Sequence, residues 1–308
     1  MNSRRIPALL LMLILPLAAV ADHSAFIIVL GVAQDAGYPQ ANCYKPHCNR
    51  AWENADFRRM ASSIAVVDNR IRKKYLFDAT PDLRNQLYEL HRIAHDEDFE
   101  LAGVFLTHGH IGHYTGLMHF GHEASGAMGV PVYAMPRMRD YLSTNGPWSQ
   151  LVSYRNIELI DMTDGNAVLL PDISVTPFLV PHRDEYTETV GFRIEGPNKS
   201  ALYLPDIDKW GRWATDIREL VKSVDYALLD ATFFADGELP GRKMEDIKHP
   251  FVEESMRLFS GLSEEDKARI IFIHFNHSNP LLIDGSDAQE NVLEQGYRFA
   301  QQGMRLPL

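Results

Sequence analysis

Phe105-Leu-Thr-His-Gly-His-Ile-Gly-His-Tyr-Thr-Gly116 is the stretch around which the chain is organised. The apolar run Leu101 to Leu106 leads into it and predicts a short buried strand, which ends in a loop with three histidines. Residues two apart in an extended segment point to the same side, so His108 and His110 can reach one point, and a turn brings His113 back towards it. Three converging imidazoles are typical of a catalytic zinc site whose fourth position is left for water. We therefore predict that these histidines bind a metal ion.

The composition indicates a globular protein with an acidic surface. Of the 308 residues, 45% are hydrophobic and 23% are charged, which is ordinary for a protein that buries a large core. The formal net charge of −11 argues against a nucleic acid or an anionic membrane as partner, because either would favour a basic face. A small-molecule substrate is the expected partner, and nothing in the pattern predicts an oligomeric state.

The N-terminus has the features of a secretory signal. Arg4 and Arg5 precede the apolar run Ile6 to Val20, and Ala19-Val-Ala21 has the A-x-A pattern of a cleavage site. We predict that residues 1–21 are a signal peptide and that residues 22–308 form one domain. The alternative is an N-terminal anchor that is not cleaved. After cleavage no membrane association is expected, and the predicted address is the periplasm or the outside of the cell.

Two cysteines, Cys43 and Cys48, lie five residues apart. In an oxidising compartment such a pair forms a small disulfide loop. A zinc site would recruit His47, but these three residues fall short of the four ligands that structural zinc needs. We favour a disulfide or free thiols over zinc.

The order of apolar and helical segments predicts two blocks of strands and helices. Expected helices include Lys209 to Val221 and Asp287 to Ala300. Expected strands include Ala25 to Val32, Ser62 to Asp68, Lys74 to Asp78, Val130 to Ala134, Asn156 to Asp161, Ile173 to Val180, Thr189 to Ile194, Ala201 to Leu204, Tyr226 to Leu229 and Arg269 to Ile273. Two sheets packed face to face with helices outside would bury both blocks. We therefore predict an α+β fold with four layers, a helix–sheet–sheet–helix (αββα) sandwich.

Four more polar residues follow buried strands and are candidates for the same site: His182, Asp206, Asp230 and His274. A polar residue at a strand end is held by a rigid element and still faces solvent. Each alone is typical of a cap or a turn, but together with the histidine loop they indicate a metal centre at one edge of the sandwich. His277 competes with His274, and His274 is preferred because it lies closer to its strand.

Thr107-His-Gly-His-Ile-Gly-His113 resembles the HxHxDH loop of the metallo-β-lactamase-fold hydrolases. His182, Asp206 and His274 then follow in the order of that superfamily's third histidine, bridging aspartate and last histidine. The resemblance implies a metal-dependent hydrolase with one or two Zn²⁺ ions, although Fe²⁺ or Mn²⁺ would suit similar ligands. The implied metal ligands are His108, His110, His113, His182, Asp206 and His274.

Within that superfamily the chain most resembles coenzyme PQQ synthesis protein B. The similar segments are Gly37 to Cys43, Phe77 to Leu83, His113 to Leu117 and His274 to Pro280. That family has been linked to iron-dependent oxidation, keeps the aspartate of HxHxDH, lacks the first two histidines of the loop and is cytoplasmic. Because this chain has the reverse pattern and a signal segment, similarity of fold does not make it a PQQ biosynthesis enzyme.

The main departure from the superfamily pattern is Gly112, which stands where HxHxDH has its aspartate. In the superfamily that aspartate binds the second metal and helps to orient the attacking water. Either only the first site fills tightly or another carboxylate substitutes, and Asp35, in the loop after the first strand, is the candidate. Asp206 is expected to bridge two metals or, with one metal, to accept the proton of the water.

Three functions fit these residues. The first is an exported zinc hydrolase acting on an ester, lactone, amide or phosphodiester. The second is an iron-dependent oxidative enzyme similar to the PQQ protein, and the third is a metal-binding or substrate-binding protein without turnover, which the absence of an aspartate at Gly112 suggests. Metal content, hydrolysis and oxygen consumption distinguish the three.

Overall fold

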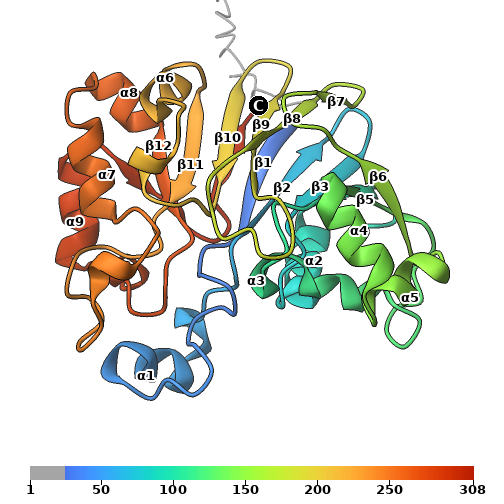
Figure 1. The fold of residues 1–308 in the computed structure, drawn as a ribbon, viewed down its shortest axis with the longest axis horizontal. Coiled ribbons are helices and arrows are strands. Elements are labelled where there is room, and N and C mark those ends of the chain that lie inside the picture. Colours follow the sequence, from blue (N-terminus) through green and yellow to red (C-terminus); the bar gives the residue numbers. More distant parts are fainter. Residues whose placement is uncertain (1–24) are drawn as a thin grey trace, which may run out of the picture.

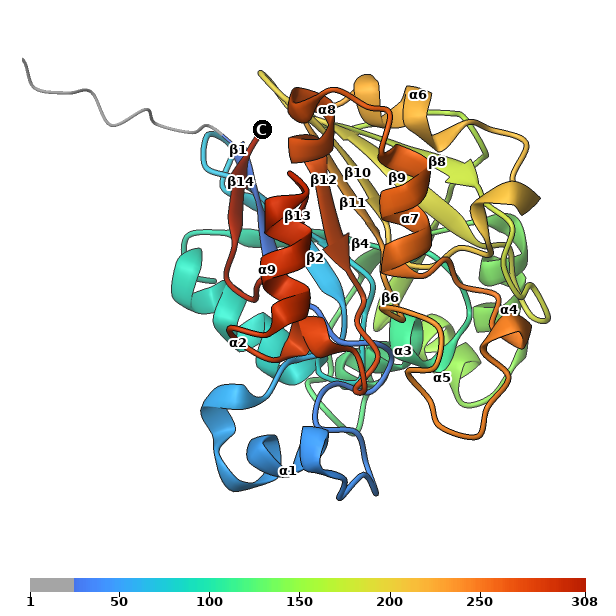
Figure 2. The same ribbon diagram turned by 90° about the vertical axis from the view of Figure 1, so that its left-hand side faces the viewer.

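The computed structural model describes residues 25–308, so the predicted signal segment, residues 1–21, lies outside the described residues. Its first sheet has seven strands in the order β14-β1-β2-β3-β4-β5-β6. These strands are β1 (Ala25–Gly31), β2 (Ser63–Asp68), β3 (Lys73–Phe77), β4 (Glu100–Phe105), β5 (Val130–Ala134), β6 (Ile157–Asp161) and β14 (Arg305–Pro307). Figure 2 shows the last strand, β14, beside the first, β1, so the two ends of the described chain lie in one sheet.

The second sheet also has seven strands, in the order β13-β12-β11-β10-β9-β8-β7. They are β7 (Val168–Leu169), β8 (Ser174–Leu179), β9 (Val190–Glu195), β10 (Ser200–Leu204), β11 (Tyr226–Asp230), β12 (Ile270–Ile273) and β13 (Arg298–Phe299). Because the central strands of both sheets are buried on both faces, they read as continuous apolar runs, such as Ile270–Ile273.

Helices cover the outer face of each sheet (Figure 1). The first sheet carries α2 (Leu83–Ile93), α3 (Ile111–Tyr114), α4 (Pro136–Thr144) and α5 (Trp148–Ser153), and the second carries α6 (Ile217–Lys222), α7 (Val252–Phe259), α8 (Glu264–Arg269) and α9 (Asp287–Glu294). Helix α1 (Pro46–Glu53) stands at one end of the sandwich. Short 3₁₀ turns occupy Ala55–Phe57, Thr115–Phe120, Trp210–Arg212, Met244–Asp246 and Pro280–Leu282. The predicted four-layer αββα sandwich is confirmed.

An aromatic stack joins the two sheets near the ends of the strands that lead to the histidine loop. The rings of Phe77 and Phe105 stack with their centroids 5.0 Å apart, and Phe105 stacks on Tyr133 at 4.2 Å. Phe192 of the facing sheet meets Phe77 edge-on at 5.4 Å. Each such pair adds about 0.5–1.5 kcal/mol beyond the burial of its area. The stack therefore fixes the position from which the chain leaves β3 and β4.

Strand direction explains why distant residues meet at one end of the sandwich. β3 and β4 are parallel, and β1 runs the same way because two antiparallel pairings separate it from β3. In the second sheet β10, β11 and β12 are parallel, and β8 shares their direction for the same reason. The loops that follow these strands all emerge at the lower end in Figure 1. Polar residues placed just after the strands are thereby gathered at one edge.

Two predicted helices are shorter in the structure. The predicted helix Lys209 to Val221 is broken, because Asp216 caps a new helix by accepting a hydrogen bond from the Arg218 backbone. The predicted helix Asp287 to Ala300 ends at Glu294, since Gly296 has a positive φ of 85° and the chain then enters β13. The apolar face of Lys209 to Val221 continued past the first break and did not reveal it, whereas Gly296 is a sequence signal for the end of the second helix.

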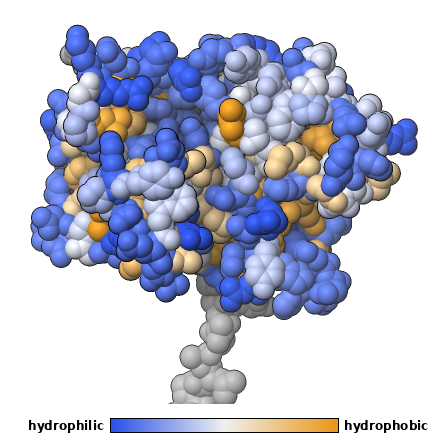
Figure 3. Space-filling view, turned by 90° about the horizontal axis from the view of Figure 1, so that it is seen from below, coloured by the Kyte–Doolittle hydropathy of each residue, from blue (hydrophilic) through white to orange (hydrophobic). Residues whose placement is uncertain are grey.

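The end of the sandwich that carries these loops has a mixed surface. Viewed from below, it is mainly hydrophilic, with separate small hydrophobic patches (Figure 3). Among residues 25–308 no helix has the length and apolar character that crossing a bilayer requires.

Candidate metal centre

The three histidines of the loop after β4 lie together. His108 Nε2 is 2.9 Å from His110 Nδ1, and the ring centroids of His108 and His113 are 4.2 Å apart. His110 is the residue before α3, and His113 lies within that helix. The turn expected after the strand therefore brings His113 back beside His108.

A first group of four donors consists of His108, His110, His182 and Asp206, whose ligand atoms all lie within 4.8 Å of one another. The ring centroids of His108 and His182 are 5.4 Å apart, and those of His110 and His182 are 5.0 Å apart. Asp206 Oδ2 is 3.4 Å from His108 Nε2, and Asp206 Oδ1 is 3.7 Å from His182 Nε2. His182 thus arrives from the end of β8 to complete a set of three imidazoles.

A second group of four donors shares Asp206 and adds Asp35, His113 and His274. Asp206 Oδ2 is 3.1 Å from His113 Nε2 and 3.7 Å from His274 Nε2. Asp35 Oδ1 is 3.6 Å from His113 Nε2 and 3.9 Å from His274 Nε2. Of the two candidates for the last histidine, His274 is the one that lies in this group, and His277 does not.

The inward-facing atoms of these residues fit a metal ion. His113 Nε2, His182 Nε2, His274 Nε2 and Asp206 Oδ1 are buried and have no hydrogen-bond partner. Buried polar atoms are costly when unpaired, so a cluster of them suits a bound cation. Two donors at about 2.1 Å from a tetrahedral ion lie about 3.4 Å apart, close to the separations within both groups. The residues present therefore suit one or two divalent cations.

A buried aspartate and a threonine set the orientation of His108. Thr107 Oγ1 donates to Asp78 Oδ1 at 2.9 Å and therefore accepts from His108 Nδ1, which is also 2.9 Å away. The proton on Nδ1 leaves the lone pair of His108 Nε2 free to face the centre. Asp78 also accepts from His113 Nδ1 at 2.7 Å, which fixes a second ring.

The second sheet repeats this arrangement with Asp230. Thr232 Oγ1 donates to Asp230 Oδ1 at 2.7 Å and accepts from His274 Nδ1 at 2.9 Å. Asp230 Oδ2 accepts from His249 Nδ1 at 2.8 Å, in the way that Asp78 accepts from His113. Each sheet thus contributes one buried aspartate that holds a threonine and a histidine.

Asp78 and Asp230 both end predicted strands, and from the sequence they are plausible carboxylates to orient metal-binding histidines, but the sequence pattern did not point to either threonine. The signal for Thr107 and Thr232 is their position, immediately before His108 and two residues after Asp230. Carboxylates also lie near the outer nitrogens of the other two rings. Glu185 Oε2 is hydrogen-bonded to His110 Nε2 at 3.3 Å, whereas Asp208 Oδ1 is 3.4 Å from His182 Nδ1 without a hydrogen bond.

The two donor groups differ in their electrostatics. Burial is the main reason why the pKa values of His108, His110 and His182 are lowered, so these rings are neutral near pH 7. Burial also lowers the pKa of His113, but the Asp78 carboxylate and its neighbours outweigh burial and raise it well above the ordinary value. For Asp206, burial acts to raise the pKa, yet the surrounding histidines hold it well below its usual range.

The same balance applies at the edge of the centre. Burial acts to raise the pKa of Asp35, but the interaction with the nearby His113 imidazole outweighs burial, and the pKa falls to about 2. For His249 burial acts downwards, and Asp230 outweighs it to raise the pKa to about 9. His249 Nδ1 is also 3.2 Å from Asp206 Oδ1, so a protonated imidazole lies beside the carboxylate that the two groups share.

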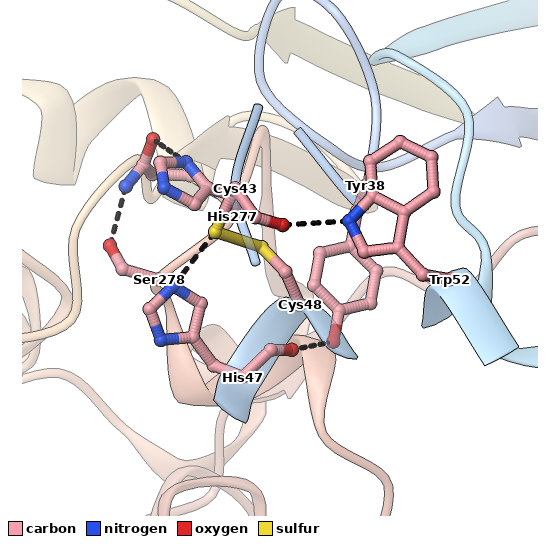
Figure 4. The surroundings of a disulfide bond; sticks show 8 residues. Tyr38, Cys43, His47, Cys48, Trp52, His277 and Ser278 are labelled. Atoms are coloured by element: carbon pink, nitrogen blue, oxygen red, sulfur yellow. Dashed lines mark hydrogen bonds between the residues drawn. A yellow bond between two sulfur atoms is a disulfide. The ribbon is translucent and has the colours of Figure 1, made fainter. Parts of the chain in front are cut away.

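Cys43 and Cys48 form a disulfide, one of the two predicted states (Figure 4). His47 lies beside it, with Nε2 3.5 Å from Cys43 Sγ, and the ring of His277 is 5.5 Å from that of His47. Donor atoms of all four residues lie within 4.8 Å of one another. His277 therefore belongs to the surroundings of the disulfide rather than to the donor groups around Asp206.

Comparisons with known proteins agree with this architecture. Residues 73–275 match the family described as the β-lactamase superfamily domain. Coenzyme PQQ synthesis protein B of Methylobacterium sp. (strain 4-46) is 30% identical over 91% of this chain and 99% of its own length. The protein of the same name from Xanthomonas campestris (strain B100) is 27% identical over 92% and 99%.

Solved structures of other proteins share this fold. Zn²⁺-bound PqqB from Methylobacterium extorquens has a TM-score of 0.77 and 25% identity, covering 92% of this chain and all of that one. A diphosphatase from the PhnP family has a TM-score of 0.63 and 23% identity over 92% and 96%. The second likeness is one of fold alone.

Proposed function

Since this chain belongs to the β-lactamase superfamily, we propose that it is an exported, metal-dependent hydrolase that cleaves an ester, lactone, amide or phosphodiester bond. The observation that carries the proposal is the pair of four-donor groups that share Asp206 and turn unpaired buried atoms inward. A small-molecule substrate is proposed because the acidic chain lacks the charge that nucleic acid would need.

The chemistry follows from what these residues can hold. A Zn²⁺ ion held by these residues would supply Lewis-acid chemistry, with a water acidic enough to act as a nucleophile near neutral pH. The imidazoles of His108, His110 and His182 are neutral at that pH and present lone pairs without losing protons. Asp206 stays ionised because the surrounding histidines lower its pKa, and it reaches both donor groups.

His249 is suited to supply a proton to the leaving group. Its Nδ1 is held by Asp230, and the pKa of about 9 keeps the ring protonated near pH 7. Its side chain is 14% exposed, whereas that of His113 is 1% exposed. A partly exposed imidazolium beside Asp206 can donate to an oxygen or nitrogen that leaves with the cleaved bond.

Export remains part of the proposal. It is supported by the signal-like pattern of residues 1–21 and by the Cys43–Cys48 disulfide, which is typical of oxidising compartments. Cell fractionation, together with mass spectrometry of the mature N-terminus, tests it. A chain that begins at Asp22 in the periplasm or medium supports export, and an intact Met1 in the cytoplasm contradicts it.

The hydrolase proposal is tested on protein purified without added metal. Elemental analysis should find one or two equivalents of zinc. Chromogenic aryl esters, lactones, amides and bis(aryl) phosphodiesters should show a turnover that a chelator abolishes and Zn²⁺ restores. Metal-bound protein that cleaves none of these bond classes with any divalent cation would contradict a hydrolase.

An iron-dependent oxidative enzyme is a second candidate. It is favoured by the 30% identity to coenzyme PQQ synthesis protein B along nearly the whole chain. Histidine and carboxylate donors also suit Fe²⁺. Iron in the purified protein, together with oxygen consumption when candidate substrates are added, would favour this function over hydrolysis.

A further inference from the structure

Asp35 reaches the centre from a different direction from the other donors. It follows β1, near the start of the described chain, whereas the histidines follow β4, β8 and β12. Its Oδ1 nevertheless stands 3.6 Å from His113 Nε2 and 3.9 Å from His274 Nε2, both of which lack a hydrogen-bond partner. With Asp35 the second group has four donors, and without it the group has three.

The backbone holds this loop in place. Ala33 forms isolated bridges to Ala61, two residues before β2, and to Phe275, the residue after His274. The Gln34 backbone N–H donates to the Phe275 carbonyl at 2.7 Å, and the Phe275 N–H donates to the Val32 carbonyl at 2.8 Å. Asp35 is therefore tied to the segment that presents His274, and its position does not depend on side-chain contacts alone.

Several residues at these strand ends have a positive backbone φ, which is energetically costly for residues other than glycine. Of the six non-glycine residues with positive φ among residues 25–308, three lie at this centre: Asp35 at 42°, Asp78 at 65° and His274 at 70°. Such conformations persist where the surroundings enforce them, and they gather at functional sites. For Asp35 the unusual φ is part of what turns the carboxylate towards His113.

Gly112 supplies the space that Asp35 occupies. A Cβ at position 112 would lie 2.4 Å from Asp35 Cα, 2.5 Å from its Oδ1 and 2.9 Å from its Cβ. Real Cβ atoms do not approach that closely, so a side chain at 112 and the observed loop exclude each other. The glycine next to His113 and the aspartate after β1 thus form a matched pair.

We infer that Asp35 is a ligand of the second metal ion, and that Gly112 is kept small so that this carboxylate can enter from the β1 loop. The inference rests on the proposed function, because it concerns the same centre. It assigns the second ion two carboxylates, Asp35 and Asp206, and two imidazoles, His113 and His274. Asp35, 77 positions before Gly112 in the chain, supplies the carboxylate that residue 112 lacks.

Two variants test the inference by different routes. Asp35→Asn removes the charge with little change of shape. Gly112→Ala changes none of the donor residues but occupies the space that Asp35 needs. The first should bind one ion tightly and the second ion at least about tenfold more weakly than wild type, since a ligand should matter no less than the outer partners of ligands. Gly112→Ala should show the same selective loss.

The readouts are metal equivalents by elemental analysis after dialysis, calorimetric titration with Zn²⁺, and the visible spectrum of the Co²⁺ protein. Asp236→Asn, an exposed aspartate in the loop before α7, and Gly261→Ala, where a Cβ meets nothing within 4 Å, are matched controls that should bind as wild type. Thermal melting in chelator should be unchanged for Asp35→Asn, whose side chain is 49% exposed.

The outcomes separate this inference from the proposed function. Wild type with two ions and Asp35→Asn with one supports the assignment, even if neither protein hydrolyses any substrate. Unchanged binding of two ions by Asp35→Asn overturns it and leaves the hydrolase proposal intact. Wild type that binds a single ion at saturating Zn²⁺ also overturns it.

Discussion

The two donor groups around Asp206 differ in the types of side chain that form them and in where those side chains come from in the chain. The first combines Asp206 with three imidazoles whose pKa values are lowered by burial, and two of the three imidazoles come from one short loop. The second has two carboxylates and two imidazoles drawn from separate parts of the chain, and the pKa of His113 is raised. The first group is therefore ready for a cation at neutral pH, whereas the second holds a proton that a cation must displace.

The largest effect is expected from Asp206, the residue that the two groups share. Asp206→Ala should lose both ions and lower kcat/KM at least about a thousandfold, because metal polarisation is worth several kcal/mol. Elemental analysis and steady-state kinetics measure the two effects. Retention of two tightly bound ions would show that the groups do not depend on a common carboxylate.

His182→Ala and His274→Ala should separate the groups. Each removes one imidazole from one group only, so each protein should keep about one equivalent of metal instead of two. The Co²⁺ spectra of the two variants should differ. The ion that remains in His274→Ala has three nitrogen donors and one oxygen donor, whereas the ion that remains in His182→Ala has two of each. Identical metal content and spectra would mean that the residues serve a single site.

Asp78→Asn should weaken the second ion more than the first. His113 Nδ1 bonds directly to Asp78, whereas His108 is reached through Thr107. Loss of such outer support costs about 10–100-fold in metal affinity. Calorimetric titration of the variant measures the affinity for each ion. An equal loss of affinity for both ions would contradict a direct role of Asp78 at the second group only.

The pH dependence of binding should differ between the groups. The raised pKa of His113 means that its proton is present near pH 7, so affinity for the second ion should rise by up to about tenfold per pH unit until that pKa is passed. The lowered pKa values of His108, His110 and His182 mean that affinity for the first ion stays nearly constant above pH 7. Calorimetric titrations in buffers of different ionisation enthalpy count the protons released as each ion binds. Equal proton release for the first and the second ion would contradict this difference.

The smallest effect on the centre is expected from Cys43→Ser. Removing a bridge over this short loop should cost about 2 kcal/mol of unfolding free energy by loop entropy. Both donor groups lie apart from the disulfide and should bind metal as before. Chemical denaturation and metal analysis check the two halves of this expectation.

Much of the fold and the position of the candidate residues could be predicted because buried strands are short apolar runs. His182, Asp206 and His274 each follow such a run, and parallel strand direction brings their ends together. The sequence also suggested Asp35 as the substitute for the missing aspartate, and the structure places it among the second donors. That these residues bind metal stays a prediction.

Other features depend on contacts that local patterns do not contain. Thr107 and Thr232 orient histidines only through buried aspartates brought in by pairing between strands. The proximity of His277 to the disulfide, rather than to the centre, follows from how the loop after β12 meets the first turn of α1. The break in the predicted helix Lys209 to Val221 and the early end of the predicted helix Asp287 to Ala300 likewise reflect a local cap and a strand pairing that apolar periodicity does not encode.

The most direct test of two ions around one shared carboxylate is a crystal structure with anomalous scattering recorded at the metal absorption edges. Two peaks are expected about 3.5–4 Å apart, as in other two-metal sites. One peak should lie among His108, His110 and His182, the other among Asp35, His113 and His274, with Asp206 between them. A single peak, or metal bound only beside Cys43 and His277, would contradict this arrangement.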